Sequence, residues 1–117
     1  NRLFLPIVEG DVGAVELRTH LLQSTSHDTP IVERLGEPCD IRLSQFFALL
    51  AMQGHGEAGP LTTNESSNVA YIRDVTNVRW AVAAYWFARK QWKGWQIEAH
   101  QFDSPCRWGA DRVFISP

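Results

Sequence analysis

Two residues near the C-terminus, Glu98 and His100, have the types and the spacing that acid–base chemistry uses. In a β-strand, residues two apart project from the same face of the sheet. A carboxylate beside an imidazole stabilises the charged ring and fixes its tautomer. With Asp103 or Cys106 close by, the pair would form a hydrolase-like arrangement of cysteine, histidine and acid. The alternative is a surface pair of Glu98 and His100 without a catalytic role.

The segment GHGEAG, residues 54–59, has the glycine spacing of a dinucleotide-binding loop. That motif requires a strand before it and a helix after it. Here the segment follows an expected helix and leads into Pro60. His55 and Glu57 within it are too few to form a metal site on their own. We therefore expect no cofactor and no metal, and we interpret the segment as a polar loop.

The most unusual stretch is RWAVAAYWFARKQWKGW, residues 79–95, which contains four of the five tryptophans. As a strand, it would place Trp80, Val82, Ala84 and Trp86 on one face and Arg79, Ala81, Ala83, Tyr85 and Phe87 on the other. The first face is expected to pack under a helix over residues 44–53. The second face is too apolar for water, so an N-terminal helix, a second copy of the chain or a flat apolar ligand should cover it.

These aromatic side chains are the candidate binding residues. They are Trp80, Tyr85, Trp86, Phe87 and Trp95. The leading hypothesis is a non-enzymatic binding module that recognises a small molecule or a protein through this aromatic sheet face. We expect it to act as a homodimer, with the small enzyme built on His100 as the alternative.

The end of the same stretch, ARKQWKGW, combines cations with indole rings. Arg89, Lys90 and Lys93 flank Trp92 and Trp95, a combination that single-stranded nucleic acid binders use. The competing interpretation is a solvated hairpin loop whose tryptophan folds back onto the sheet. Because the formal net charge of the chain is −2, nucleic-acid binding is the third hypothesis.

Two helices are expected ahead of this stretch. Residues 11–24 begin with a possible Asp11 cap and contain apolar residues at helical spacing. The next segment, to residue 39, is expected to be a loop with one helical turn after Pro30. The second helix spans residues 44–53, with Ser44 as its N-cap and Gly54 as a left-handed stop. Residues 54–68 are expected to form a surface loop.

The rest of the chain is expected to form strands. They are VAYIRDV, RWAVAAYWF, GWQIEAHQF and DRVFIS, connected as a meander. Asp74 would support the first turn, and Arg73 would pair with Glu98 or a neighbouring acid. The predicted fold is therefore α+β, with two N-terminal helices packed on an antiparallel sheet of about four strands. A continuous helix from Val78 to Trp92 would contradict it.

Length and composition place these elements in one domain. The chain has 117 residues, of which 44% are hydrophobic and 21% charged, which is ordinary for a soluble globular protein. We expect a single domain over residues 1–117. Cys39 and Cys106 are expected to be free thiols in the cytoplasm rather than a disulfide. No apolar run is long enough to cross a membrane, so we expect no membrane partner.

Two phrases in the C-terminal half, NVAYIRDVTNVRWAV and SPCRWGADRVFIS, resemble small orphan bacterial proteins carried on mobile gene cassettes. The resemblance covers about the last fifty residues. It implies a cytoplasmic bacterial setting and no particular activity.

Overall fold

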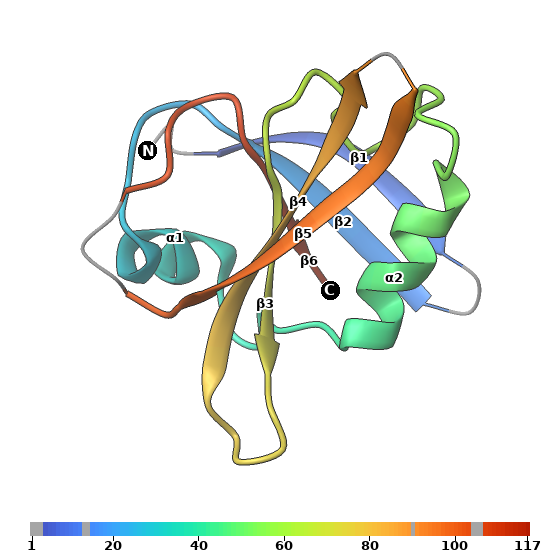
Figure 1. The fold of residues 1–117 in the computed structure, drawn as a ribbon. Helices are drawn as coiled ribbons and strands as arrows, with labels where there is room; N and C mark the ends of the chain where they lie inside the picture. Colours follow the sequence, from blue (N-terminus) through green and yellow to red (C-terminus); the bar gives the residue numbers. More distant parts are fainter. Residues whose placement is uncertain (1–3, 13–14, 90, 104–106) are drawn as a thin grey trace.

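The structure is a computed structural model that describes residues 4–12, 15–89, 91–103 and 107–117, with side chains from Leu17 onward within these ranges. In chain order the elements are β1 (Phe4–Val12), β2 (Val15–Leu22), α1 (Asp28–Leu35), α2 (Leu43–Met52), β3 (Asn68–Arg73), β4 (Arg79–Arg89), β5 (Trp92–Gln101) and β6 (Val113–Ser116). Figure 1 shows their arrangement.

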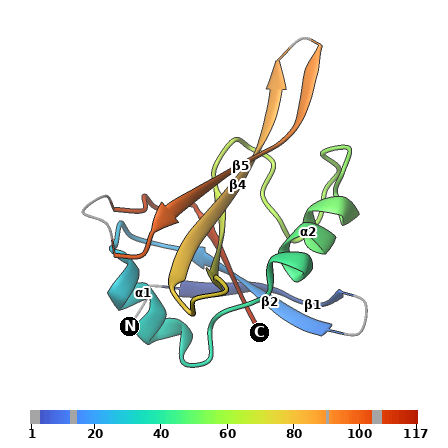
Figure 2. The ribbon, with the colours of Figure 1, turned by 60° about the horizontal axis from the view of Figure 1, so that its bottom comes forward.

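The described strands form one six-stranded sheet in the order β1-β2-β6-β3-β4-β5. β1 and β2 form an antiparallel hairpin, and β3, β4 and β5 form an antiparallel meander. β6 lies between these two units, antiparallel to β2 and parallel to β3. The last strand of the chain therefore joins the two units into one mixed sheet. The far end of the β4–β5 hairpin projects away from the body of the protein (Figure 2).

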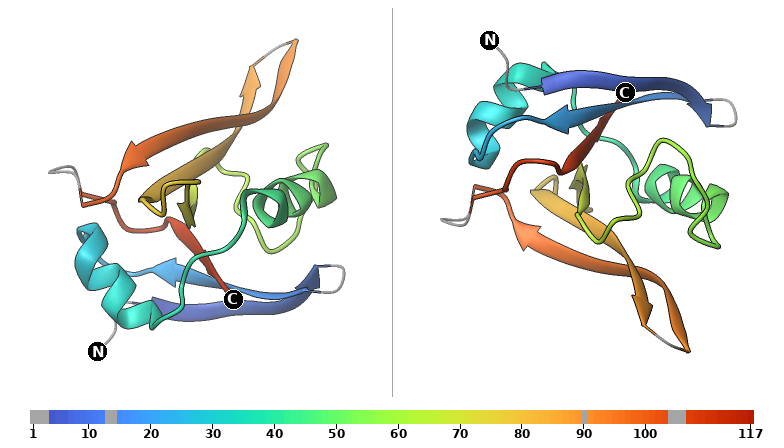
Figure 3. Two further views of the ribbon diagram at one scale, coloured as in Figure 1. Left: turned by 90° about the horizontal axis from the view of Figure 1, so that it is seen from below. Right: turned by 90° about the horizontal axis from the view of Figure 1, so that it is seen from above.

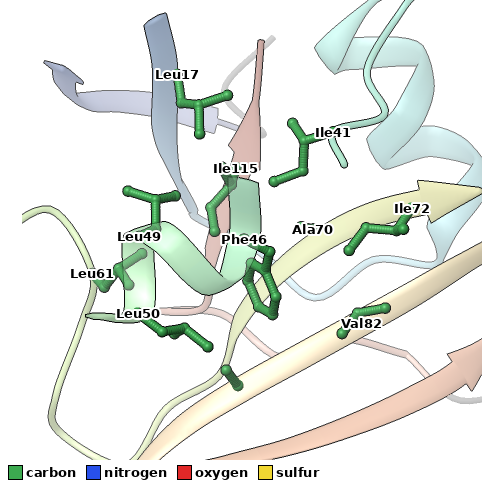
Figure 4. Packing of buried hydrophobic residues seen from close by; sticks show 11 residues of the cluster. Leu17, Ile41, Phe46, Leu49, Leu50, Leu61, Ala70, Ile72, Val82 and Ile115 are labelled. Carbon is green, nitrogen blue, oxygen red and sulfur yellow. The ribbon is translucent and has the colours of Figure 1, made fainter. Parts of the chain in front are cut away.

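Helix α2 covers one face of this sheet. Its buried residues Phe46, Leu49 and Leu50 pack against side chains from four strands, as Figure 4 shows for most of them. The strand residues in this core are Leu17, Ala70, Ile72, Val82, Ala84 and Ile115. The prediction that this helix packs over the tryptophan-rich strand is confirmed for Val82, with Trp80 and Trp95 at the margin of the same core.

Helix α1 covers the opposite face, so the sheet lies between two helices (Figure 3). Its residues Ile31 and Val32 are buried with residues of β2, β3, β4 and β6. The strand residues of this second core are Leu22, Val69, Tyr71, Ala81, Ala83 and Phe114. Alternate residues of one strand thus enter two different cores, which is the consequence of a two-residue period in a sheet covered on both faces.

The tryptophan-rich stretch is extended, as predicted. It forms β4 and β5, which pair without interruption from Trp80 opposite Gln101 to Arg89 opposite Trp92. The two faces of β4 separate as expected, because Val82 and Ala84 enter the α2 core while Ala81 and Ala83 enter the α1 core. Strands over VAYIR, GWQIEAHQ and VFIS are confirmed as well.

The helix predicted over residues 11–24 is wrong, because this segment contributes to the β1–β2 hairpin. Leu17 is buried in the α2 core and Leu22 in the α1 core. A helix would have brought the apolar residues to one side, whereas a central strand buries both of its faces. Gly13, which weakens a helix, was the sequence signal against it.

The expected sheet of about four antiparallel strands is also too small and too simple. The N-terminal hairpin adds two strands, and β6 leaves the meander to pair with β2 and β3. What remains of the prediction is a mixed α and β fold with two helices among the described residues. Neither of these helices is long and apolar enough to cross a membrane.

The helix over residues 44–53 is present as α2, but its ends differ from the prediction. The helix starts at Leu43, and its N-cap is Arg42 rather than Ser44. The Gln45 side chain accepts a hydrogen bond from the Arg42 N–H at 2.7 Å. Gly54 is not left-handed, whereas Gly56 is, with φ of 76°. The single helical turn expected after Pro30 is the longer helix α1.

Candidate ligand-binding groove

An apolar groove of about 880 Å³ lies between the N-terminal half of α2 and the strands β3, β4 and β5. Its apolar walls come from these four elements, from the α1–α2 connection and from the β3–β4 turn. They are Ile41, Leu43, Phe47, Ile72, Val75, Trp80, Val82, Ile97 and Ala99. The charged residues Asp40, Arg42, Arg73 and Asp74 also border it. Its volume lies within the range of sites that bind drug-sized molecules.

The groove exists because α2 is apolar nearly all round, while the sheet buries only part of its surface. Phe46 is fully buried under the helix, but Phe47 is 46% exposed and Leu43 is 43% exposed. Across the groove, Ile97 on β5 is 44% exposed. Exposed apolar side chains that gather around one concave surface are typical of a binding site, whereas scattered ones are normal.

Trp80 forms a rigid wall of this groove. Its indole Nε1 donates to Asp74 Oδ2 at 2.9 Å, which fixes the ring. The other oxygen of Asp74 accepts hydrogen bonds from Thr76 and from the Val78 N–H in the β3–β4 turn. These donors, with Thr76 first and Trp80 next, lower the pKa of Asp74. The predicted role of Asp74 in the turn is therefore confirmed.

The charged rim beside Trp80 is internally neutralised. Arg79 binds Asp40 through Nε at 2.7 Å and through Nη2 at 2.9 Å, and it also binds Glu37 at 3.0 Å. Arg73 binds Asp40 at 3.2 Å and donates to the Asn77 carbonyl. Burial opposes ionisation of Asp40, but the two arginines outweigh it and lower its pKa. Arg73 was predicted to pair with Glu98 or a neighbouring acid. Its partner is the acid Asp40 and not Glu98, which lies two strands away on β5.

Glu37, Cys39 and Asp40 have potential metal-ligating atoms within 4.8 Å of one another. Both carboxylates already bind Arg79. Cys39 is a free thiol that is fully buried, and its burial raises its pKa to about 11. A metal ligand must be the thiolate. The cluster is therefore best explained as a brace that attaches the α1–α2 connection to β3 and β4.

Two predicted ligand-binding residues, Trp86 and Trp95, are used to anchor the end of α2. Trp95 Nε1 donates to the carbonyls of Leu50 and Gln53, at 3.1 Å each. Trp86 meets the ring of Trp95 edge to face at 5.4 Å. A Cβ added at Gly56 would lie 2.5 Å from the Trp86 ring. These contacts explain both tryptophans by packing.

Two more of the predicted ligand-binding residues, Tyr85 and Phe87, lie on the face of β4 opposite the groove. Both are partly exposed, and the Arg89 guanidinium lies 5.3 Å from the centre of the Phe87 ring. Nearer the start of β4, Ala81 and Ala83 are covered by the α1 core. The sequence predicted that something must cover this face of β4. Helix α1 covers it at these two residues, whereas the expected helix over residues 11–24 does not exist among the described residues. Of the five predicted ligand-binding residues, Trp80 alone lines the groove.

Two of the candidate catalytic residues, Glu98 and His100, lie on β5 and project from the sheet face opposite the groove. His100 Nε2 and Glu98 Oε1 are 3.2 Å apart, and both side chains are well exposed. The His100 ring meets Trp108 edge to face at 5.3 Å. Asp103 follows β5, and its backbone N–H donates to Asp28 at 2.7 Å. Cys106 lies outside the described residues, so the structure brings together only Glu98 and His100.

The candidate nucleic-acid residues lie at the far end of the β4–β5 hairpin. Arg89 binds both carboxylate oxygens of Glu65, so its charge is neutralised. Trp92 is 76% exposed and does not fold back onto the sheet, which corrects the loop interpretation for this residue. Lys93 is exposed beside it, and Lys90 lies outside the described residues.

Sequence reasoning missed the groove residues Phe47 and Ile97. The signal for Phe47 was present, since an apolar surface that wraps a helix exceeds what one sheet face can cover. Ile97 gave no such signal, because its exposure depends on β5 being the last strand of the sheet.

Among the described residues, the fold and the groove thus define a mixed α and β structure with one sheet, a helix on each face and an apolar surface groove. Comparison with protein-family models, with curated proteins and with solved structures finds no match to this chain. The resemblance to gene-cassette proteins therefore stays an expectation.

Proposed function

We propose that this protein is a non-catalytic binding module whose ligand is a small, uncharged molecule with a flat apolar body, bound in the groove between α2 and the strands β3–β5. The observation that supports it is the composition of the walls. Partly exposed Phe47, Leu43 and Ile97 surround one concavity together with the fixed ring of Trp80.

The shape of the walls favours a flat ligand. Val82 and Ala99, which pair across β4 and β5, line the groove with smaller side chains than Trp80 and Phe47, which line it as well. Small residues next to large rings leave a slot for a planar group. A rigid wall also reduces the entropy lost on binding, and Trp80 is fixed through Asp74.

The pairing of Asp40, Arg73 and Asp74 at the rim favours an uncharged ligand. Arg73 and Asp40 bind each other, and the Asp74 carboxylate accepts hydrogen bonds from its own turn. An anion or a cation would have to compete with these partners. Arg42 is exposed at the rim, so an anionic probe tests this inference directly.

The groove proposal is tested with Nile red, an uncharged planar dye whose fluorescence increases in apolar surroundings. We expect saturable binding, and we expect Phe47→Gln to weaken it about tenfold, because an aromatic contact worth roughly 1.5 kcal/mol is lost. Met52→Gln is the matched control, because Met52 is 55% exposed on the same helix but does not line the groove. Equal losses in the two variants would contradict the proposal.

Two further measurements sharpen this test. The anionic dye anilinonaphthalene sulfonate should bind more weakly than Nile red, and a preference for the anion that Arg42→Gln removes would contradict the inference of a neutral ligand. His100→Ala, on the opposite face of the sheet, should leave Nile red affinity unchanged.

A second candidate function, an enzyme using His100, is favoured by one contact, the 3.2 Å separation between its imidazole and Glu98. For such an enzyme, His100→Ala would abolish turnover of its substrate, whereas for a binding module the same change leaves ligand affinity unaffected. We also propose a cytoplasmic location, which the free thiol of Cys39 supports.

A further inference from the structure

The outer edge of strand β5 is an open hydrogen-bonding surface. Among the strands that the structure describes, β5 ends the sheet order and pairs with β4 alone. Among the backbone hydrogen bonds of the described residues, none joins the outer side of β5 to another segment. Such an edge offers a row of unpaired N–H and C=O groups to an incoming strand.

The two edges of the sheet differ in their protection. β1, at the other edge, contains Pro6, and its register shifts between Pro6 and Val8. A proline and a bulge are the usual means of blocking further pairing at an edge. β5 spans ten residues without proline, and its pairing with β4 has no irregularity. This contrast indicates that β5 is an edge available for pairing.

We infer that β5 pairs antiparallel with β5 of a second copy of this chain, forming a homodimer with a continuous sheet and with Gln96 on the two-fold axis. This inference is independent of the proposed ligand. The homodimer expected from the sequence was to cover the second face of β4, whereas this dimer forms at the sheet edge.

The geometry of the strand restricts the register. Residues opposite each other in an antiparallel pair point to the same face. A two-fold axis normal to the sheet also keeps each residue and its copy on the same face. The register must therefore place one residue opposite its own copy, at the axis. If most of Trp92–Gln101 takes part in the pairing, the residue at the axis is Gln96 or Ile97, which lie in the middle of β5. With Ile97 on the axis, Glu98 would lie diagonal to Glu98 of the second copy, and like charges across strands destabilise a sheet.

With Gln96 on the axis, the exposed side chains of β5 are matched. Trp92, 76% exposed, lies opposite His100 of the second copy. Ile97, 44% exposed, lies opposite Trp95 of the second copy. Glu98 lies opposite Gly94, where a Cβ would meet nothing within 4 Å. The strand is therefore complementary to itself, which favours a second copy over an unrelated peptide.

Sedimentation equilibrium of the chain tests this inference. We expect a reversible dimer, and we expect Gln96→Lys to raise its dissociation constant at least about tenfold, because two like charges then meet across the axis. Gln23→Lys is the matched control, since Gln23 is exposed and lies outside the sheet. A native chain that stays monomeric at high concentration, or a dimer that Gln96→Lys leaves intact, would overturn the inference.

Cross-linking tests the register separately. In a Cys106→Ser background, Gln96→Cys should form a disulfide-linked dimer on mild oxidation, because residues on the axis have Cβ atoms about 5 Å apart. Glu98→Cys is the control, since in this register the two copies of residue 98 are roughly 13 Å apart along the strand. Equal cross-linking of both variants would overturn the inference.

The two proposals fail in different ways. Gln96 points away from the groove, because Ile97 and Ala99 of the same strand line it. Gln96→Lys should therefore bind Nile red like the native chain. Loss of dimerisation with unchanged dye binding isolates the edge contact, and loss of dye binding in Phe47→Gln with an unchanged dimer isolates the groove.

Discussion

The buried carboxylate of Asp28 connects segments that are far apart in the sequence. Asp28 is 2% exposed at the start of α1. Its Oδ1 accepts hydrogen bonds from the Tyr71 hydroxyl at 2.8 Å and from Trp108 Nε1 at 2.7 Å, and its Oδ2 accepts one from the Asp103 N–H. A buried carboxylate is tolerated when donors satisfy both of its oxygens.

We predict that Asp28→Asn destabilises the protein by about 1–3 kcal/mol, since the new amide N–H₂ group faces a donor instead of accepting from it. Tyr71→Phe should cost less, about 1 kcal/mol, because two donors to the carboxylate remain. Urea unfolding of both variants and of the double mutant measures these values. A stability of Asp28→Asn equal to that of the native chain would contradict this account.

The same residue shows a limit of sequence analysis. A helix start at Asp28 is compatible with the local sequence, because Pro30 fits the first turn of a helix. Its partners Tyr71, Asp103 and Trp108 are 43, 75 and 80 residues away. No local pattern specifies such contacts, because they depend on how the strands are ordered in the sheet.

At the scale of the elements, α2 is fixed at its end by a side chain from the sheet. The last carbonyls of a helix lack intrahelical partners, and here the Trp95 indole binds the carbonyls of Leu50 and Gln53. This contact also explains why Trp95 faces α2 while Trp92, three residues earlier, is exposed.

We predict that Trp95→Phe lowers the free energy of unfolding by about 1 kcal/mol or more, because the ring is retained but its N–H donor is lost. Amide exchange in the last turn of α2 should become faster. Trp92→Phe is the matched control, and in the monomer, where Trp92 is exposed, it should change neither quantity. Equal effects at the two positions would show that the indole N–H of Trp95 does not stabilise the helix end.

Elements with an unambiguous local pattern were predictable from the sequence, and those that depend on neighbouring strands were not. The helix over residues 44–53 has a clear helical pattern. The stretch that forms β3 and β4 fits a helix as well, and its alternation of apolar side chains favoured strands. Residues 15–22 fit both a helical and a strand pattern, and only their burial on both faces selects the strand. Trp80 was predicted for the binding site, whereas Phe47 and Ile97 become visible only once the sheet order is known.

At the scale of the whole molecule, β6 contributes a buried side chain to each of the two cores. This short strand is central in the sheet order and pairs with both β2 and β3. Phe114 points into the core under α1, and the next residue, Ile115, points into the core under α2. Because both side chains are fully buried on one strand, we expect the two layers to unfold together.

This coupling is tested by observing one layer while the other is altered. Cys39 is buried in the α1 core, and in a Cys106→Ser background its labelling by a thiol reagent reports opening of that layer. We predict that Ile115→Ala, which alters only the α2 core, destabilises the protein by about 2–4 kcal/mol and accelerates the labelling of Cys39 in proportion. Phe114→Ala, which alters the α1 core directly, is the comparison. If Ile115→Ala lowers the melting temperature but leaves the labelling rate of Cys39 unchanged, the two layers open independently and β6 does not couple them.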